Sequence, residues 1–443
     1  MATTQPFVDD TLPWADRNRL RTAQALLIGV YTSKNEESAA REHVQELALL
    51  SETHKISVCE TALIHARDFS AKTFISSGKI EELQQLALEK GCTLIIFDDE
   101  ITPSQQRNLE EEFKLPVIDR REVILGVFAD RAKSHEAKLQ VELARVQYLI
   151  PRLKRMWTHL SRQAGGGGGM SGGGYLKGEG EKQIEIDRRI LKRRQGQLQK
   201  EIDEIERYRV TQRALREKNA IPVFAIVGYT NAGKSSLLRL LTGADVYIED
   251  MLFATLDTTT RRFTLPSAQE VLLIDTVGFI RKLPHQLVAA FKSTLEEAVE
   301  ADFLIHLIDS SHPNALGQAE TTVHLLKELH AGQTPMITVI NKIDLSDNEQ
   351  QISMIQKLKI AYPRSVLLSA KTGEGVDALF AEMELLLKAG RERLELLIPQ
   401  SRYDLVLEAK KNGRVYSEEY RDNDVVLDIE LPKGEAQRLR SKF

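Results

Sequence analysis

The sequence is poor in cysteine, in aromatic residues and in long apolar runs. Only two of its 443 residues are cysteines, Cys59 and Cys92, and they fall in different expected elements. Two isolated cysteines make neither a disulfide framework nor a zinc site, so we expect two buried thiols of a reducing compartment. No run approaches the roughly 18 apolar residues of a membrane-spanning helix, and residues 1–19 contain no apolar signal region. These absences indicate a cytoplasmic protein without a transmembrane segment.

Neither sign of charge dominates the chain. Lysine and arginine together number 60, aspartate and glutamate 64, and the formal net charge is −4. A protein that is basic throughout is therefore excluded, and any contact with nucleic acid needs basic residues concentrated locally. Apolar residues make up 42% and charged residues 28%, which is ordinary for a globular protein, and the length allows about three domains.

The hydrophobic pattern nevertheless changes character three times, which divides the chain into four parts. Residues 1–132 alternate apolar runs at 25–30 and 93–97 with helical periods at 39–50 and 79–90, which indicates a small α/β domain with a parallel sheet. Asp98 and Asp99 follow the second run and either ligate a metal or simply begin a loop. Residues 218–392 resume the strand–loop–helix alternation. Residues 393–443 predict strands at 394–398 and 425–429 around a helix at 403–411, a small α+β domain.

Residues 133–217 predict a helical hairpin with a coiled-coil-like seam. Apolar residues recur in steps of three, four and seven on both helices, namely Leu139, Val146, Ile150 and Leu153, then Leu191, Leu198, Ile202 and Ile205. Between the helices, residues 165–180 contain ten glycines in sixteen positions. The hairpin should therefore end in a long flexible tip.

Basic residues crowd both sides of this tip. A flexible tip with cations and with the rings of Trp157, His159 and Tyr175 suits contacts to RNA phosphates and unpaired bases. The alternative is a glycine linker between two solvated helix faces. The candidates for RNA contact are Arg152, Lys154, Arg155, Arg162, Arg188, Arg189, Arg193 and Arg194.

The strongest motif follows the apolar run at 223–227. It reads G-x-x-x-x-G-K-S, formed by Gly228, Tyr229, Thr230, Asn231, Ala232, Gly233, Lys234 and Ser235, and a helical pattern follows it. Backbone N–H groups of such a loop surround phosphate oxygens, and the helix N-terminus adds its dipole. Lys234 would reach the β- and γ-phosphates, and the Ser235 hydroxyl would ligate Mg²⁺.

A second phosphate-side motif, D-x-x-G, ends the next apolar run. It consists of Asp275, Thr276, Val277 and Gly278. Asp275 would hold Mg²⁺ through water, and the Gly278 N–H would sense the γ-phosphate. The next residue is Phe279, where Ras-type enzymes carry the glutamine that orients the attacking water. A phenyl ring cannot do this, so hydrolysis is slow or another group positions the water. No catalytic residue is therefore assigned.

Two further motifs select the base. Asn341, Lys342, Ile343 and Asp344 follow the apolar run at 336–340, and Ser369, Ala370 and Lys371 follow the run at 366–368. The Asp344 carboxylate can accept from guanine N1–H and the 2-amino group, whereas adenine would leave it unpaired. The Lys342 stem can cover the base, Asn341 can tie neighbouring loops together, and the Ala370 N–H is placed for guanine O6. The four ordered motifs predict a guanine-specific GTPase.

The segment between the first two motifs should supply a second Mg²⁺ ligand. It begins with Phe253, Ala254, Thr255, Leu256 and Asp257. Four threonines, Thr255, Thr258, Thr259 and Thr260, compete for this role, and their spacing does not choose between them.

Taken together, these motifs resemble the HflX family of GTPases over nearly the whole chain. The matching segments are G-Y-T-N-A-G-K-S at 228–235, F-A-T-L-D at 253–257, D-T-V-G-F at 275–279 and G-E-G-E-K-Q-I-E-I-D-R-R at 178–189. Thr258, Glu179, Lys177 and the run 165–169 depart from the family pattern. They leave the nucleotide site untouched and bear on how the tip meets RNA.

The resemblance implies a ribosome-associated GTPase that binds the large subunit and its rRNA, with the tip near the peptidyl-transferase region. It also implies splitting of stalled ribosomes after stress, Mg²⁺ with GTP as substrate, and Thr255 as the second protein ligand of the metal. We expect a monomer, built as a P-loop GTPase domain behind a small α/β domain and a helical hairpin and ahead of a small α+β domain. A GTP-gated RNA-binding protein with negligible turnover, and a GTPase associated with RNA modification, are the alternatives.

Overall fold

The computed structural model describes residues 22–153, 176–217, 221–243, 252–253, 258–282, 299–345 and 348–440. The chain forms two compact units, which are described separately. The first contains residues 1–204 with 249–256 and 282–292, and the second contains the remainder. None of the helices in the described ranges is long and apolar enough to cross a membrane.

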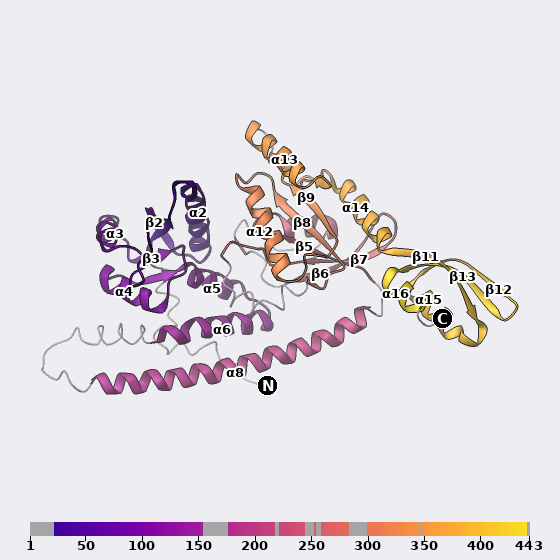
Figure 1. Ribbon diagram of the computed structural model, residues 1–443, viewed down its shortest axis with the longest axis horizontal. Coiled ribbons are helices and arrows are strands. Elements are labelled where there is room, and N and C mark those ends of the chain that lie inside the picture. The colour runs from indigo at the N-terminus through magenta and orange to yellow at the C-terminus, as the bar shows by residue number, and fades with distance from the viewer. Residues whose placement is uncertain are drawn as a thin grey trace. The chain divides into compact units, whose positions relative to one another are not determined.

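A four-stranded parallel sheet forms the centre of the first unit. Its order is β2-β1-β3-β4, with β1 at Gln24–Tyr31, β2 at Ser57–His65, β3 at Leu94–Phe97 and β4 at Val117–Asp119. The helices are α2 (Glu37–Thr53), α3 (Ser77–Glu89), α4 (Pro103–Phe113) and α5 (Arg120–Arg131). Helices α3 and α4 cover one face and α2 and α5 the other (Figure 1). Because both faces are covered, β1 and β3 read as continuous apolar runs, as the sequence predicted.

The expectation of two buried thiols is wrong, because Cys59 and Cys92 form a disulfide. The pairing of β1 with β2 shifts register between Ala25 and Leu26, and Cys59 is the extra residue of that bulge. Cys92 lies two residues before β3, on the other side of β1 in the sheet order. Sequence spacing could not reveal the pair, because 33 residues separate its members and only the pairing of β1 with both β2 and β3 places them near each other.

Asp98 and Asp99, which end β3, face cations. Asp98 is buried and accepts from Arg120 at 2.7 Å and from Lys282 at 2.6 Å, while Lys282 also donates to Asp99 at 2.7 Å. Burial alone would raise the pKa of Asp98, but Arg120 and Lys282 outweigh it and hold this pKa below its usual value. Within the described ranges no cluster of three potential metal ligands occurs. The two aspartates therefore anchor basic side chains in this structure.

The helical hairpin contains α6 (His135–Leu149) and α8 (Leu176–Glu217), with a short 3₁₀ turn at Ile150–Arg152 after α6. The predicted seam is present: Leu139, Val146 and Leu153 are buried on the first side, and Leu191, Leu198 and Ile202 on the second. Ile150 is only half-buried, because it begins the 3₁₀ turn. The glycine tip up to residue 175 lies outside the described residues.

The second unit is built around a six-stranded sheet of order β10-β9-β8-β5-β7-β6. Its strands are β5 (Val223–Gly228), β6 (Thr259–Thr264), β7 (Glu270–Asp275), β8 (Phe303–Asp309), β9 (Met336–Asn341) and β10 (Ser365–Leu367). Only the β6–β7 pair is antiparallel. Helices α9 (Lys234–Thr242) and α14 (Val376–Ala389) pack on one face, and α12 (Ala315–Glu328) and α13 (Glu349–Ala361) on the other. This is the predicted fold of a P-loop GTPase domain.

The C-terminal part is an antiparallel sheet with two helices on one face. Strands β11 (Arg391–Pro399), β13 (Asp424–Pro432) and β12 (Arg414–Arg421) pair in that order, and α15 (Tyr403–Asn412) and α16 (Lys433–Arg440) cover them. The predicted strands and the first helix are present. The prediction missed β12 and α16, because β12 reads R-V-Y-S-E-E-Y-R, with too many charges to resemble a strand.

One buried histidine stands out in the core of the second unit. His306 lies in the middle of β8 with no exposed surface, and neither ring nitrogen has a hydrogen-bond partner among the described residues. Its ring meets Tyr362 edge-on at 5.9 Å between centroids. Burial without a partner disfavours the charged form and lowers the pKa of His306 to about 4.

We predict that His306 makes the second unit acid-sensitive. Because the unfolded chain binds a proton near pH 6.5 and folded His306 does not, the free energy of unfolding should fall as the pH drops from about 6.5 towards 4. The contribution is roughly 3 kcal/mol across that window. His306→Leu should flatten this part of a stability-against-pH curve measured by urea unfolding. His324→Leu, at an exposed helical site, is the control and should leave the slope in place.

Candidate nucleotide site

The P-loop needs glycine at both of its fixed positions. A Cβ atom on Gly228 would lie 2.4 Å from the Leu307 carbonyl oxygen, and one on Gly233 would lie 2.4 Å from Asn341 Nδ2. Gly233 also has a φ of +96°, a left-handed conformation, immediately before α9 begins. The loop can therefore turn tightly from β5 into the helix N-terminus, which is the geometry that surrounds an anion.

Lys234 is buried at the centre of this loop. Its ammonium donates to the carbonyl oxygens of Gly228 at 3.2 Å and Tyr229 at 2.8 Å. Burial lowers the pKa of Lys234 to about 8, and the nearby charge of Asp275 opposes that shift only in part. The Thr230 hydroxyl oxygen is also buried, with no hydrogen-bond partner among the described residues. A bound phosphate would supply the anion and the acceptor that this pocket needs.

Ser235 and Asp275 place two oxygen ligands side by side. The Ser235 hydroxyl donates to Asp275 Oδ2 at 2.6 Å, and Asp275 is fully buried at the end of β7. A hydroxyl, a carboxylate and phosphate oxygens are the hard ligands that Mg²⁺ prefers, so these residues fit the metal. Ser235 would hold Mg²⁺ directly and Asp275 would hold it through water, and the ion would supply positive charge against the phosphates.

The D-x-x-G motif is fastened to the P-loop through Phe279. The Phe279 N–H donates to the Gly228 oxygen at 3.0 Å, and the Phe279 oxygen accepts from the Thr230 N–H at 2.8 Å. Its ring is buried with 1% of its surface exposed. A Cβ atom on Gly278 would lie only 3.0 Å from Lys234 Nζ. The absence of a side chain at Gly278 therefore lets its backbone lie close to the P-loop lysine. Phe279 is thus a buried anchor, which agrees with the expectation that it does not orient water.

The base-recognition motifs meet through Asn341. Its Nδ2 donates to the Ala232 oxygen in the P-loop at 2.8 Å, and its Oδ1 accepts from the Ala370 N–H at 2.9 Å. The Ser369 hydroxyl donates to Asp344 Oδ1 at 2.7 Å, which holds the carboxylate in place. The Ala370 N–H is therefore engaged within the site, and its donation to guanine O6 stays a prediction. Ile343 and Lys371 occupy the loops that carry these contacts.

The segment expected to supply the threonine ligand is only partly described. Phe253 is buried with a φ of +55°, whereas residues 254–257, with Ala254, Thr255, Leu256 and Asp257, lie outside the described residues. Thr259 and Thr260 pair with Asp275 and Ile274 inside the β6–β7 ladder. These two threonines are therefore fixed in a strand, and Thr255 remains our proposal for the ligand.

Comparison with known proteins agrees with this geometry. Three family models match: "GTP-binding GTPase N-terminal" at residues 41–129, "GTP-binding GTPase Middle Region" at 131–216 and "50S ribosome-binding GTPase" at 223–342. The GTPase HflX of Chlamydia pneumoniae is 46% identical over 422 residues, covering 95% of this chain and 87% of the relative. The chain belongs to the HflX family of GTPases.

Two further relatives complete the comparison. The GTPase HflX of Akkermansia muciniphila is 48% identical over 420 residues, which cover 94% of this chain and 96% of the relative. A solved GTP-binding protein from the archaeon Sulfolobus solfataricus in complex with GDP is 25% identical, with a TM-score of 0.40, and covers 81% of this chain and 98% of that chain. The Chlamydia and Akkermansia relatives confirm the predicted resemblance to HflX at the level of the family.

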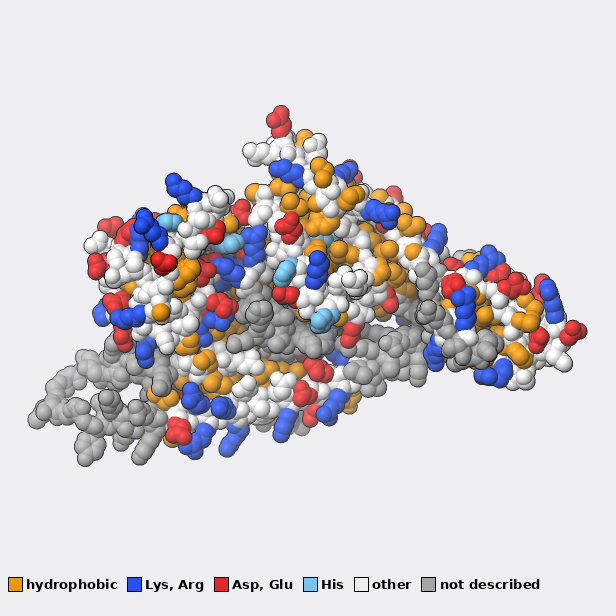
Figure 2. All heavy atoms as spheres, in the orientation of Figure 1, with side chains coloured by type: hydrophobic (Ala, Val, Ile, Leu, Met, Phe, Trp, Pro, Cys, Tyr) orange, Lys and Arg blue, Asp and Glu red, His pale blue; other side chains and the backbone are white. Residues whose placement is uncertain are grey.

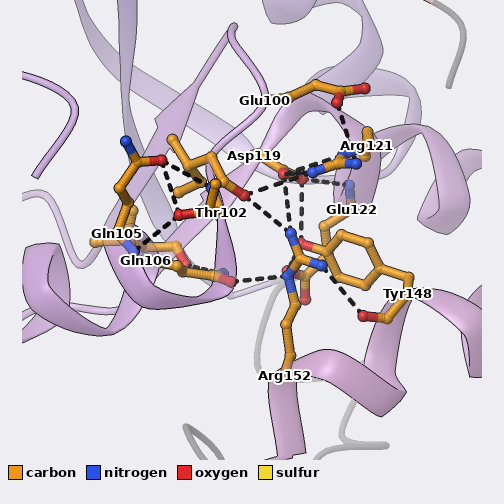
Figure 3. A network of polar contacts seen from close by, with 11 residues as sticks. Glu100, Thr102, Gln105, Gln106, Asp119, Arg121, Glu122, Tyr148 and Arg152 are labelled. Carbon is orange, nitrogen blue, oxygen red and sulfur yellow. Dashed lines mark hydrogen bonds and ion pairs between the residues drawn. The ribbon is translucent and has the colours of Figure 1, made fainter. Parts of the chain in front are cut away.

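Two of the predicted RNA-contact residues of this HflX-family chain are committed elsewhere. Arg152 is buried and donates to Gln106 Oε1 at 2.9 Å and to the Ile101 oxygen at 3.0 Å, and it stacks on Tyr148 with 3.7 Å to the ring centroid (Figure 3). Asp119 Oδ2 lies 3.5 Å from Arg152 Nη2, the nitrogen that also donates to the Ile101 oxygen. The assignment of Arg152 to RNA is therefore wrong, because the 3₁₀ turn after α6 directs it into the protein.

Arg194 is the second correction. Its guanidinium makes two hydrogen bonds to Glu142 of α6, at 2.7 and 2.9 Å. The bond to Glu142 is the main reason that the pKa of Arg194 is raised, although burial opposes it. Arg194 therefore ties α8 to α6. Lys154, Arg155 and Arg162 lie outside the described residues, so Arg188, Arg189 and Arg193 are the predicted candidates that the structure leaves exposed.

We predict that Asp344 sets the base specificity of the HflX-family site. Asp344→Asn removes an acceptor for guanine N1–H and should cost about 2–4 kcal/mol of GTP binding, from a lost charge-assisted bond and an unpaired polar group. Titration calorimetry with GTP measures the loss. Asp377→Asn, an exposed acid in the first turn of α14, is the control. Equal GTP affinity in wild type and the Asp344 variant would refute the role of this motif.

Proposed function

We propose that this HflX-family GTPase uses GTP to gate its engagement with the large ribosomal subunit, and that it splits or rescues stalled ribosomes. It acts as a monomer in the cytoplasm, with Mg²⁺ as the cofactor of GTP. The match of residues 223–342 to a family described as a 50S ribosome-binding GTPase supports the partner. The observation that carries the proposal is an exposed basic face on the hairpin.

This basic face lies on α8, on the side away from the seam. Arg188, Arg189, Lys192 and Arg193 are exposed, whereas Leu191 between them is buried. Figure 2 shows Lys and Arg side chains gathered along this helix. Apart from the exposed pair of Arg189 with Glu185 at 3.0 Å, no ion pair is found for these four residues in the described structure. Such a face suits a row of RNA phosphates, which bind cations with release of counterions.

The main alternative is a GTP-gated RNA-binding protein with negligible turnover. Phe279 favours it, because the residue after Gly278 is buried and offers no polar group for the attacking water.

The other alternative is a GTPase associated with RNA modification. Such a protein would need a second set of catalytic residues outside the P-loop GTPase domain. The three family models that match this chain, at 41–129, 131–216 and 223–342, all describe GTPases. We therefore keep the proposal of a GTPase whose hydrolysis of GTP depends on a partner.

We predict that isolated protein hydrolyses GTP slowly and that large ribosomal subunits accelerate it at least tenfold. Such a factor needs only about 1.4 kcal/mol of transition-state stabilisation or ordering. Multiple-turnover phosphate release with and without subunits measures it. Co-sedimentation with subunits under a GTP analogue, GDP and no nucleotide shows whether the nucleotide gates the encounter. Fast hydrolysis that ignores added subunits would show that water is already positioned within the chain.

We also predict that the basic face sets the salt dependence of ribosome binding. Changing Arg188, Arg189 and Arg193 together to Gln removes up to three phosphate contacts. The slope of log affinity against log salt should then shrink by roughly 2 for a structured RNA. GTP affinity should stay the same, because the three arginines lie outside the P-loop GTPase domain. The hairpin should also stay folded, because the buried seam residues Leu191 and Leu198 are left intact.

The control for this experiment is a triple variant of exposed lysines on the P-loop GTPase domain. Lys357, Lys359 and Lys388 lie on α13 and α14, and changing them to Gln alters the net charge by the same amount. Its salt slope should match that of wild type. Identical slopes for wild type and the arginine variant would mean that the face is only solvated, and that the hairpin is a spacer.

A further inference from the structure

The three residues at the carboxyl end of β8, Asp309-Ser310-Ser311, belong to none of the four nucleotide motifs. Strand β8 runs parallel to β9 with Asp309 opposite Asn341, so this end of β8 lies beside the start of the N-K-x-D loop. Each of the three residues makes a polar contact there or supports one. We call them the β8 bracket.

Two members of the bracket contact the loop directly. Ser310 donates to the Asn341 carbonyl oxygen twice, from its N–H at 3.0 Å and from its hydroxyl at 2.7 Å. Asp309 Oδ2 accepts from Lys342 Nζ at 2.6 Å, in an ion pair whose side chains are only 12% and 24% exposed. The bracket thus contacts two consecutive residues of the N-K-x-D motif, Asn341 through its backbone carbonyl and Lys342 through its ammonium.

The third member supports the first. Ser311 donates to Asp309 Oδ1 from its N–H at 3.0 Å and from its hydroxyl at 2.5 Å. One carboxylate oxygen is therefore occupied by Ser311 and the other by Lys342, so the Asp309 side chain has little freedom to rotate. A held carboxylate orders its partner at a lower entropic cost than a mobile one.

Lys342 has a particular need for such support. Its φ is +65°, a left-handed conformation that is unfavourable for a side chain with a Cβ atom. Its four-carbon stem carries several rotatable bonds, and ordering them against a base costs entropy when the nucleotide binds. An ion pair at the far end of the stem restricts the rotamers of Lys342 before the nucleotide binds, so less entropy is lost on binding.

We propose that Asp309 is a positioning residue for guanine-nucleotide binding, and that it acts by holding Lys342 over the base while Ser311 holds Asp309. The proposal rests on the assignment of the Lys342 stem to the face of guanine. It predicts that loss of Asp309 weakens nucleotide binding and raises KM without changing kcat, because the base remains remote from the γ-phosphate throughout hydrolysis.

A double-mutant cycle on the full-length protein tests this. The variants are Asp309→Asn, which keeps the shape of the side chain, Lys342→Met, which keeps the stem and removes the charge, and the double variant. GDP affinity is measured by titration calorimetry in the presence of Mg²⁺, with thermal unfolding of each variant recorded alongside. Asp309→Asn should weaken GDP binding roughly fivefold, since the pair is partly exposed. In the Lys342→Met background the same change should have no further effect.

The outcomes separate the proposal from its premise. No loss of GDP affinity in Lys342→Ala, which removes the stem as well, would refute the premise that the lysine stem covers the base. No effect of Lys342→Met would overturn the proposal, because the ammonium that Asp309 holds would then be dispensable. An effect of Lys342→Met with none from Asp309→Asn would overturn the proposal itself. Equal losses from Asp309→Asn in both backgrounds would also overturn it, because Asp309 would then act through the fold of β8. If Asp309→Asn fails to fold, Ser311→Ala should give a smaller loss of GDP affinity that likewise vanishes beside Lys342→Met.

Discussion

The nucleotide site depends on the hydrogen bonds of one buried amide. Asn341 donates to the P-loop at Ala232 and accepts from Ala370, and its own carbonyl accepts from Ser310. These contacts connect four segments that are distant in sequence, namely the P-loop, the N-K-x-D loop, the S-A-K loop and the end of β8. An amide is suited to this role because it offers a donor and an acceptor on one short, neutral side chain, so burial carries no cost of desolvating a charge.

The two charged groups of the same site, Lys234 and Asp275, make hydrogen bonds to neutral groups. Lys234 is buried, and its ammonium donates to two backbone carbonyl oxygens, those of Gly228 and Tyr229. Asp275 is occupied by a neutral hydroxyl, from Ser235. A bound phosphate would therefore meet the ammonium of Lys234, and a metal would meet the oxygens of Ser235 and Asp275.

The motifs that carry the chemistry could be read from the sequence because their spacing is dictated by backbone geometry. A glycine that must avoid Leu307, or an aspartate that must end β7, leaves a recognisable pattern. Contacts between distant side chains leave none. Arg152 reads as a basic residue beside a glycine tip, yet tertiary packing turns it onto Tyr148.

The same limit applies to Asp309 and to the cysteines. Asp309 sits in an ordinary strand end, D-S-S, and only the parallel register of β8 and β9 places it beside Lys342. Strand β12 was missed for a local reason, because its charged residues obscure the alternation of apolar and polar residues that marks a strand. Elements and motifs follow from local pattern, whereas partners across elements require the topology.

The disulfide of the first unit has a consequence for association between copies. Among the described strands β2 lies at the edge of its sheet, and a sheet edge can accept a strand from another molecule through its backbone groups. Exchange of β2 between two chains would require it to leave its place beside β1. With Cys59 joined to Cys92, that strand is covalently tied to the start of β3 and cannot be donated alone. The disulfide would therefore disfavour a swap of β2 alone, and its reduction would remove that restraint.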